Sequence, residues 1–320
     1  MCTAIYDNRS GAFLGRTLDV EQSYKESVVT VPRGCAFDTV HTGRVEYKNS
    51  AVGIAFVSGG VPLFFDGINS AGLAACALNF GLSCTYHQNK NESLNLAPFE
   101  VIPYALARYC TVDELVQAFA LLNIVRDGFG NLPTTPLHWI FADRTRAVTL
   151  ESTDSGTHIY ENKLGILTNA PEYPYHLYRA ADIMGLSAEG PEDKIGNGTL
   201  FRYSRGMGGI GLPGDNSSSS RFLRALFNKS YSCDYKNENS VTDFFHLFDS
   251  VSVTRGTVVC DDGSQSYTAY TSVMDLEKKR YYFTTYNNRQ IRAVNMPNDK
   301  KCKQICSYTM QTEPKIEYLN

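Results

Sequence analysis

Short strand-like segments that begin at the second residue constrain the fold of this chain more than any other feature. The first four such segments lie at 2–7, 12–19, 27–34 and 51–60. Turn sequences such as "NRSG" separate them, and the same alternation of apolar runs and tight turns returns over 137–161 and 266–287. Strands joined by such short turns pair antiparallel, so we expect antiparallel meanders in the first, middle and last parts of the chain.

Amphipathic helices are expected between the meanders. They lie at 97–110, 111–123, 217–229 and 240–251. The second begins with the capping box Thr111-x-x-Glu114, and the first contains Pro103, which can kink it. Each predicted helix has one polar side, so the helices are expected to cover sheets rather than fill the centre. This order of elements predicts an α+β fold with two facing antiparallel sheets and outer helices.

A single domain spanning 1–320 is expected, because no linker-like segment and no repeat of 20 to 50 residues divides the chain. The Gly/Ser-rich segment 206–220 is predicted to be a mobile loop. The formal net charge of −3 favours a small-molecule partner over nucleic acid or an anionic membrane. The chain shows no secretion signal and no apolar run of 18 residues, so we expect a cytoplasmic protein.

No metal site or organic cofactor is predicted. Nine cysteines, an odd number, fit reduced thiols better than a disulfide framework. Cys302 and Cys306 have three residues between them and no second pair of ligands nearby in the sequence, which argues against zinc. The six histidines are isolated from one another, and the chain contains no HExxH, EF-hand or phosphate-loop pattern.

Cys2 directly follows the initiator methionine, and removal of Met1 would place two reactive groups on one residue. The thiol has a reference pKa of about 8.5 and the new α-amine one of about 8, so the amine could take the proton of the thiol. A cation near the sulfur and a carboxylate near the amine would support this pair. Arg16 and Asp19 in "GRTLD" can supply both, because the predicted hairpin returns the chain to its start.

An acyl-transfer site also needs hydrogen-bond donors for the tetrahedral oxyanion. Asn79 in "ALNF" and Asn169 in "GILTNAP" are candidates, each at the end of an apolar, strand-like segment. Ordinary alternatives exist for every candidate. Asparagine at a strand end commonly forms a turn, Arg16 and Asp19 can pair on the surface, and Arg221 can be a solvated charge on its helix. A cysteine at position 2 is, by itself, more often inert than catalytic.

Taken together, the candidate residues and their flanking motifs resemble the choloylglycine hydrolase family of N-terminal nucleophile hydrolases, which includes bile salt hydrolases and penicillin V acylases. The matching segments follow the family order over nearly the whole chain. They are "MCTA" (1–4), "LGRTLD" (14–19), "VTVPRG" (29–34), "ALNF" (77–80), "LHW" (137–139), "GILTNAPEY" (165–173), "GLPGDNSSSSRF" (211–222), and "YTSVMD" with "RYYFTTYNN" near the end.

The resemblance implies the four-layer αββα fold, removal of Met1, a homotetramer and no cofactor. Carried over position by position, it assigns catalytic roles to Cys2, Arg16, Asp19, Asn79, Asn169 and Arg221. Cys2 takes the place of the nucleophile and Asn169 that of the oxyanion-binding side chain. Asn79 takes the place of a residue that contributes a backbone N–H. The implied reaction is attack by the Cys2 thiolate on an amide, followed by hydrolysis of the thioester with the amine as base.

The substrate expected from the resemblance is a glycine- or taurine-conjugated bile salt. Asn79 in "LNF" matches a motif of bile salt hydrolases, whereas penicillin acylases tend to carry an aromatic residue there. Aromatic-rich loops with Phe64 and Phe65 are expected to line an apolar pocket for the steroid, although core packing explains these side chains as well.

Two alternative functions remain open. The segment after "ALNF" lacks the proline usual in these hydrolases, and Thr17 stands where many members have asparagine. These departures keep penicillin V acylase, or another N-acyl amide hydrolase, as an alternative. A noncatalytic binding protein of the same fold is a further alternative. Retention of Met1 would favour it, because a blocked amine cannot act as a base.

Overall fold

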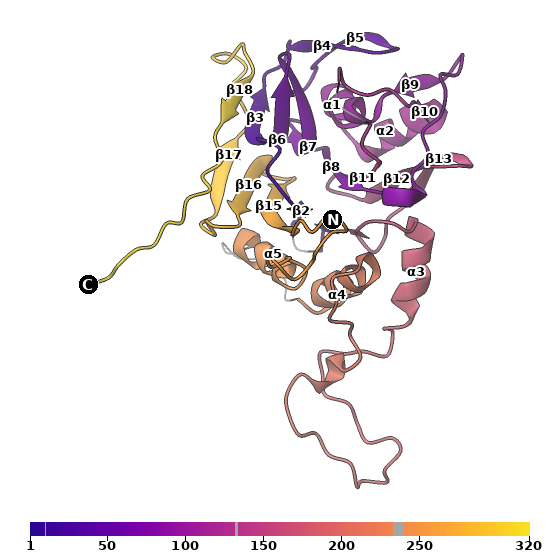
Figure 1. The fold of residues 1–320 in the computed structure, drawn as a ribbon, viewed down its shortest axis with the longest axis vertical. Helices are drawn as coiled ribbons and strands as arrows, with labels where there is room; N and C mark the ends of the chain where they lie inside the picture. Colours follow the sequence, from indigo (N-terminus) through magenta and orange to yellow (C-terminus); the bar gives the residue numbers. More distant parts are fainter. Residues whose placement is uncertain (10, 132–133, 233–239) are drawn as a thin grey trace.

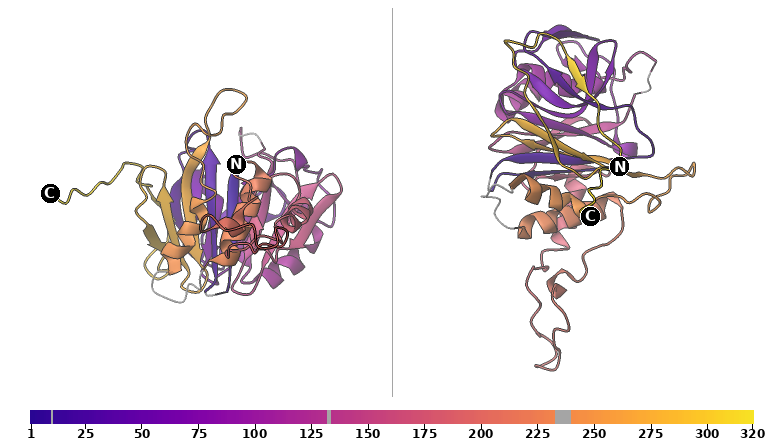
Figure 2. Two further views of the ribbon diagram at one scale, coloured as in Figure 1. Left: turned by 90° about the horizontal axis from the view of Figure 1, so that it is seen from below. Right: turned by 90° about the vertical axis from the view of Figure 1, so that its left-hand side faces the viewer.

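Two antiparallel sheets face each other at the centre of the fold (Figure 1, Figure 2). The computed structural model describes residues 1–9, 11–131, 134–232 and 240–320, so Ser10 of the predicted "NRSG" turn lies outside the described residues. The six-stranded sheet has the order β14 (Ile166–Leu167), β1 (Cys2–Asp7), β2 (Phe13–Val20), β15 (Tyr267–Asp275), β16 (Arg280–Thr285), β17 (Arg292–Asn295).

The second large sheet has eight strands, and the pairings in both sheets are antiparallel. Its order is β13 (Gly156–Glu161), β12 (Ala147–Thr153), β11 (Leu137–Ala142), β8 (Ala74–Asn79), β7 (Val61–Asn69), β6 (Ala51–Ser58), β3 (Ser27–Val31), β18 (Cys306–Tyr308). Two small sheets pair β4 (Ala36–Thr39) with β5 (Gly43–Glu46) and β9 (Leu94–Leu96) with β10 (Leu122–Ile124).

Helices cover the outer faces of both large sheets. Their bounds are α1 (Val101–Arg108), α2 (Val112–Ala118), α3 (Tyr173–Ala181), α4 (Ser218–Tyr231) and α5 (Ser240–Asp249). Figure 1 shows α1 and α2 beside the eight-stranded sheet and α4 and α5 beneath the six-stranded one, where α4 contacts β1 and α5 contacts β15. The predicted α+β architecture with four layers is therefore confirmed.

Strands β1 and β2 are buried along their whole length. The cause is the layer order, because one face of the six-stranded sheet packs on the other sheet and the opposite face packs on α4 and α5. A side chain on either face of β2 therefore lies in the interior. This includes Arg16 and Asp19, which the sequence alone could equally have placed at the surface.

The predicted segment 61–67, "VPLFFDG", is a strand and not a loop. Ile54 pairs with Asp66 and Ala55 pairs with Phe64, so Phe65 is the extra residue of a β-bulge. A bulge interrupts the two-residue alternation by which strands are recognised in a sequence. Phe64 and Phe65 thus lie on β7, which corrects the prediction that they belong to an irregular loop.

The first two predicted helices are shorter than expected. Pro103 is the third residue of α1, where a backbone N–H has no partner within the helix, so the proline removes no hydrogen bond of α1. After α2 a 3₁₀ turn (Phe119–Leu121) leads into β10. The capping box is half formed. Thr111 Oγ1 accepts from Glu114 N at 3.2 Å, but the Glu114 carboxylate accepts from the backbone N–H of Cys110, the residue before Thr111.

None of the helices in the described part of the chain combines the length and apolarity needed to cross a bilayer. The cytoplasmic location expected from the sequence stays a prediction.

Candidate active site

Cys2 is the first residue of β1 and lies next to Arg16 of β2. The register pairs Cys2 with Leu18 and Ala4 with Arg16, so Cys2 and Arg16 are diagonal neighbours on one face of the hairpin. Nη2 of Arg16 lies 2.6 Å from Sγ of Cys2, and both side chains are buried. The hairpin predicted from the sequence thus brings a cation to the sulfur.

The rest of the Arg16 guanidinium is held by backbone oxygens and a carboxylate. Nε donates to Thr17 O at 3.1 Å, and Nη1 donates to Phe65 O at 3.3 Å. Phe65 is the bulged residue of β7. The ion-pair partner of Arg16 is Asp66, at 3.8 Å, and not Asp19. Burial tends to lower the pKa of Arg16, but the charges of Cys2, Tyr270 and Asp66 reverse this effect and raise it.

Asp19 follows Leu18, the partner of Cys2 on β2, and is also fully buried. Its Oδ1 accepts from Thr268 Oγ1 at 2.6 Å, and its Oδ2 from Thr17 Oγ1 at 3.3 Å. The backbone of Asp19 pairs with Met1 through two hydrogen bonds, of 2.6 and 2.9 Å. The carboxylate therefore sits at the point where the chain enters β1.

Arg221 of α4 links three parts of the site. Its Nη1 donates to Cys2 O and to Thr3 Oγ1, the latter at 2.7 Å. Its Nη2 donates to Asn169 Oδ1 at 2.6 Å. The side chain is fully buried, so it is not a solvated charge on the helix surface. Burial lowers the pKa of Arg221, against the opposing charges of Asp19 and Cys2.

Asn169 follows the short strand β14 and uses both ends of its carboxamide. Oδ1 accepts from Cys2 N at 3.0 Å as well as from Arg221, and Nδ2 donates to Asn79 O at 2.7 Å. Its backbone is fixed by two buried histidines. Nε2 of His176 donates to Asn169 O at 2.9 Å. Nε2 of His138 donates to the carbonyl of the preceding residue, Thr168, at 3.1 Å.

Asn79 is the last residue of β8, and its backbone carbonyl faces Asn169. Leu137 N donates to Tyr86 Oη, and Phe80 N donates to Pro136 O, so Asn79 and Leu137 form a pair without mutual hydrogen bonds. The N–H of Asn79 therefore points away from β11, on the side where its carbonyl meets Asn169.

A cavity of about 820 Å³ opens beside Cys2. Arg16, Asp19 and Asn79 line it together with Cys2, as do the predicted pocket residues Phe64 and Phe65. Further apolar lining comes from Leu18, Val20, Phe56, Leu63, Phe99, Phe129 and Trp139. Met1 also lines this cavity, so its removal would widen the space next to Cys2. The volume is within the range of small-molecule sites in proteins.

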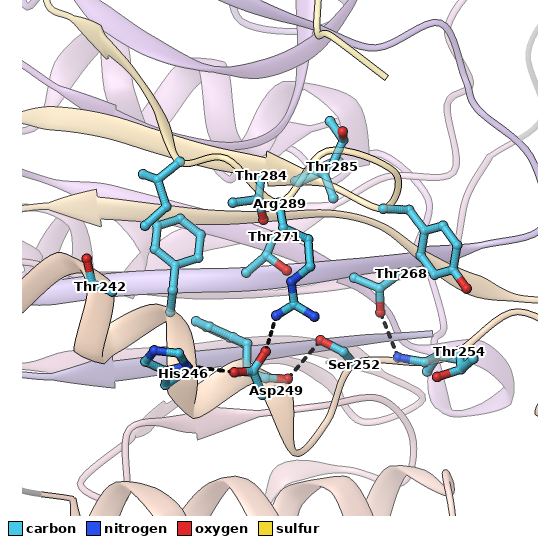
Figure 3. Close-up of a pocket in the computed structure, with 16 residues that line it drawn as sticks. Thr242, His246, Asp249, Ser252, Thr254, Thr268, Thr271, Thr284, Thr285 and Arg289 are labelled. Carbon is cyan, nitrogen blue, oxygen red and sulfur yellow. Dashed lines mark hydrogen bonds and ion pairs between the residues drawn. The ribbon is translucent and has the colours of Figure 1, made fainter. Parts of the chain in front are cut away.

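A second cavity, of about 510 Å³, lies between α5 and strands β15 and β16 (Figure 3). Hydroxyl-bearing side chains dominate its wall, and at its edge Asp249 accepts from His246 Nδ1 at 2.8 Å and pairs with Arg289. Cys2 does not line it. Thr268 does, and Thr268 also donates to Asp19, so this wall supports the Cys2 site from outside.

The structure thus brings the six sequence-predicted catalytic candidates together at the start of β1: Arg16 contacts the thiol of Cys2, Arg221 and Asn169 contact its backbone, Asp19 pairs with Met1, and Asn79 contacts Asn169. Sequence reasoning missed Asp66, Thr268, His138 and His176 as supporting residues. The "LHW" motif contained His138, but nothing local marked its link to Asn169. In the described ranges, no group of three or more His, Cys, Asp or Glu side chains is arranged to hold a metal ion.

Comparison with known proteins assigns the family. The family model described as linear amide C–N hydrolases, choloylglycine hydrolase family, matches residues 2–308. The chain is 36% identical to a protein of Lactiplantibacillus plantarum named bile salt hydrolase/transferase, over 324 residues and the full length of both chains. The present chain therefore belongs to the choloylglycine hydrolase family. It is therefore a hydrolase of linear amide C–N bonds.

Solved structures agree with the fold of the choloylglycine hydrolase family. The C2A mutant of the conjugated bile acid hydrolase from Clostridium perfringens is similar with a TM-score of 0.92, at 30% identity and full coverage of both chains. A penicillin V acylase from Agrobacterium tumefaciens has a TM-score of 0.77 at 22% identity, with 97% of this chain and 91% of the other covered. The second likeness concerns the fold alone.

Arg221→Lys is expected to destabilise this hydrolase by about 3 kcal/mol. An ammonium cannot replace a guanidinium that donates to β1, to Asn169 and, through Nε at 3.0 Å, to Asn216 O just before α4. Urea unfolding followed by circular dichroism measures the change. Arg179→Lys is the matched control, since Arg179 is partly exposed and paired with Asp182, and should cost less than about 1 kcal/mol. Equal losses of stability in the two variants would contradict the conclusion that Arg221 holds β1, Asn169 and the start of α4 together.

Proposed function

We propose that this protein hydrolyses the amide bond of glycine- or taurine-conjugated bile salts, with Cys2 as nucleophile after removal of Met1. The observation that carries the proposal is the 2.6 Å contact between Arg16 and the Cys2 sulfur at the wall of a largely apolar cavity. The names of relatives, bile salt hydrolase/transferase and conjugated bile acid hydrolase, support this substrate class.

Arg16 stabilises the thiolate of Cys2 in the proposed mechanism, because a fully buried cation beside a sulfur favours the anion. Loss of Met1 turns the Cys2 nitrogen into an α-amine. In the structure, Asn169 Oδ1 already accepts a hydrogen bond from this nitrogen at 3.0 Å, and the same oxygen would orient the amine. Asp19, whose backbone pairs with Met1, supplies the carboxylate near the new terminus.

Asn169 and Asn79 supply the oxyanion donors in this proposal. Nδ2 of Asn169 uses one hydrogen on Asn79 O, which leaves its second hydrogen for the substrate oxygen. The N–H of Asn79 points to the same side of β8. Both donors are held rigidly before substrate arrives, and the backbone of Asn169 is fixed by His176 and by Ser218 Oγ.

The remaining steps follow from proton balance. The thiolate attacks the amide carbon, and the ammonium of Cys2 gives its proton to the departing glycine or taurine nitrogen. A water molecule then attacks the thioester and loses a proton to the free amine, which releases the bile acid. The steroid is proposed to lie against the apolar wall that includes Phe64 and Phe65.

Cys2→Ala is expected to lower kcat/KM for glycocholate and taurocholate by at least about 10³-fold, since no other nucleophile is proposed. Cys110→Ala is the control, because Cys110 is exposed and does not line the cavity. The same assay includes penicillin V. A higher kcat/KM for penicillin V than for both bile salts would refute the substrate choice and leave the nucleophile intact.

Retention of Met1 is expected to abolish hydrolysis, because the nitrogen of an internal residue cannot act as base. Intact mass spectrometry of the active protein should show a chain that lacks one methionine. A form with a cleavable extension before Cys2 should be inactive, and removal of the extension should restore turnover. Full activity in the extended form would exclude the amine as base and favour another mechanism.

We propose a homotetramer as the assembled form. Residues 182–217, between α3 and α4, extend away from the layers (Figure 1, Figure 2) and expose apolar side chains at Ile195, Phe201 and Tyr203. Contact with another copy of the chain would cover them.

Light scattering coupled to size exclusion is expected to give four chain masses for the wild type. The double variant Ile195→Asp, Phe201→Asp should give a smaller assembly, because both side chains are more than four-fifths exposed in the single chain. Tyr24→Asp is the control, because Tyr24 is an exposed aromatic residue outside the segment 182–217. A monomeric wild type would contradict the proposal.

A further inference from the structure

A second buried carboxylate, Asp66, lies next to the Arg16 guanidinium and has no part in the mechanism above. It belongs to β7 of the eight-stranded sheet, and its partners come from the other large sheet. Oδ2 of Asp66 lies 3.8 Å from Nη1 of Arg16, and neither side chain is accessible to solvent. The neighbouring residue, Phe65, uses its bulged carbonyl for the same guanidinium.

Three hydroxyl groups surround the Asp66 carboxylate. Tyr270 Oη donates to Oδ2 at 2.6 Å, Ser272 Oγ donates to Oδ1 at 3.1 Å, and Tyr281 Oη also donates to Oδ1. Burial raises the pKa of Asp66, and Arg16 together with the hydroxyl groups opposes this rise. Three O–H donors and one guanidinium around a single carboxyl group favour its ionised form.

Four fully buried charged side chains form a cluster at Cys2. They are Arg16, Arg221, Asp19 and Asp66. Their charges cancel, so the cluster is neutral as long as Cys2 carries its thiol proton and its nitrogen is an amide. Removal of Met1 adds an ammonium, and a thiolate on the same residue restores neutrality. A buried site tolerates this matched pair far better than either charge alone.

We propose that Asp66 is a positioning residue for the nucleophile, which holds Arg16 against the Cys2 sulfur and keeps the site neutral when Cys2 is a thiolate beside an ammonium. The inference rests on the function proposed above. It assigns to Asp66 a role in setting the pH range of activity, in addition to any role in folding.

Other ionisable groups also face this cluster. Burial lowers the pKa of His176, which lies near Arg221. Burial raises the pKa of Tyr270, of Tyr281 and of Cys76, the partner of Asp66 on β8, well above their ordinary values. The two arginines stay charged. In this proposal, Asp66 acts on the proton that the thiol and the amine of Cys2 share.

Asp66→Asn removes one negative charge and leaves the buried cluster with an excess positive charge. Proton loss from the thiol–ammonium pair of Cys2 then becomes easier. Both limbs of the pH profile of kcat/KM for glycocholate should move to lower pH, by about 1 unit. A purely structural role would lower the plateau and leave both limbs in place.

Asp275→Asn is the matched control. Asp275 is another buried carboxylate, at the last position of β15, where it accepts from the backbone of the following turn. Asp275→Asn should keep both limbs of the pH profile of kcat/KM at their wild-type positions. If Asp66→Asn does not fold, Tyr281→Phe takes its place, because loss of one donor makes Asp66 take up a proton more readily. The acid limb should then move in the same direction by a smaller amount.

The rate at which iodoacetamide alkylates Cys2 gives a readout that needs no substrate. Peptide mass spectrometry on the processed protein follows this rate against pH, and the profile of Asp66→Asn should lie at lower pH than that of the wild type. Unshifted limbs and an unshifted alkylation profile, or shifts to higher pH, would overturn the role of Asp66. A wild type that hydrolyses no conjugated bile salt would instead refute the proposed function, and the alkylation profile would still test Asp66.

Discussion

Burial of charge at the centre of a two-sheet sandwich is the constraint on which the rest of this structure depends. A buried guanidinium or carboxylate must find partners for its hydrogen-bonding groups, because desolvation otherwise costs several kcal/mol. Arg16 finds them in Cys2, Phe65 and Asp66, and Arg221 finds them in β1 and the Asn169 loop. The same contacts that make the charges tolerable in the interior also surround the thiol.

Irregular features of the two sheets provide these contacts. The bulge at Phe65 frees a backbone carbonyl of β7 from the ladder, and that carbonyl accepts from Arg16. The last residue of β8, Asn79, turns its carbonyl and its N–H away from β11 and toward Asn169. Regular strands would have used these groups in pairing, so the site exists where the ladders are interrupted.

Much of this arrangement could be predicted from the sequence. The alternation over 2–7 and 12–19 predicted the hairpin, and the hairpin predicted that Arg16 and Asp19 return to the chain start. Asp66 could not be predicted as a partner of Arg16, because the bulge beside it concealed a strand and the hydroxyl groups that hold its carboxylate come from residues about 200 positions away in the chain. His138 and His176 were missed for a similar reason, since each acts through a backbone carbonyl.

The sequence by itself determined the first hairpin, the amphipathic segments that contain α1, α2, α4 and α5, and the presence of a cysteine with a nearby arginine and aspartate at the start of the chain. These properties depend on periodicity and turn residues within a few positions of each other. Only the tertiary structure decided that Arg16 pairs with Asp66 rather than Asp19, and that Arg221 is buried rather than solvated. Such choices depend on which faces the layers cover, and that is a property of packing between distant segments.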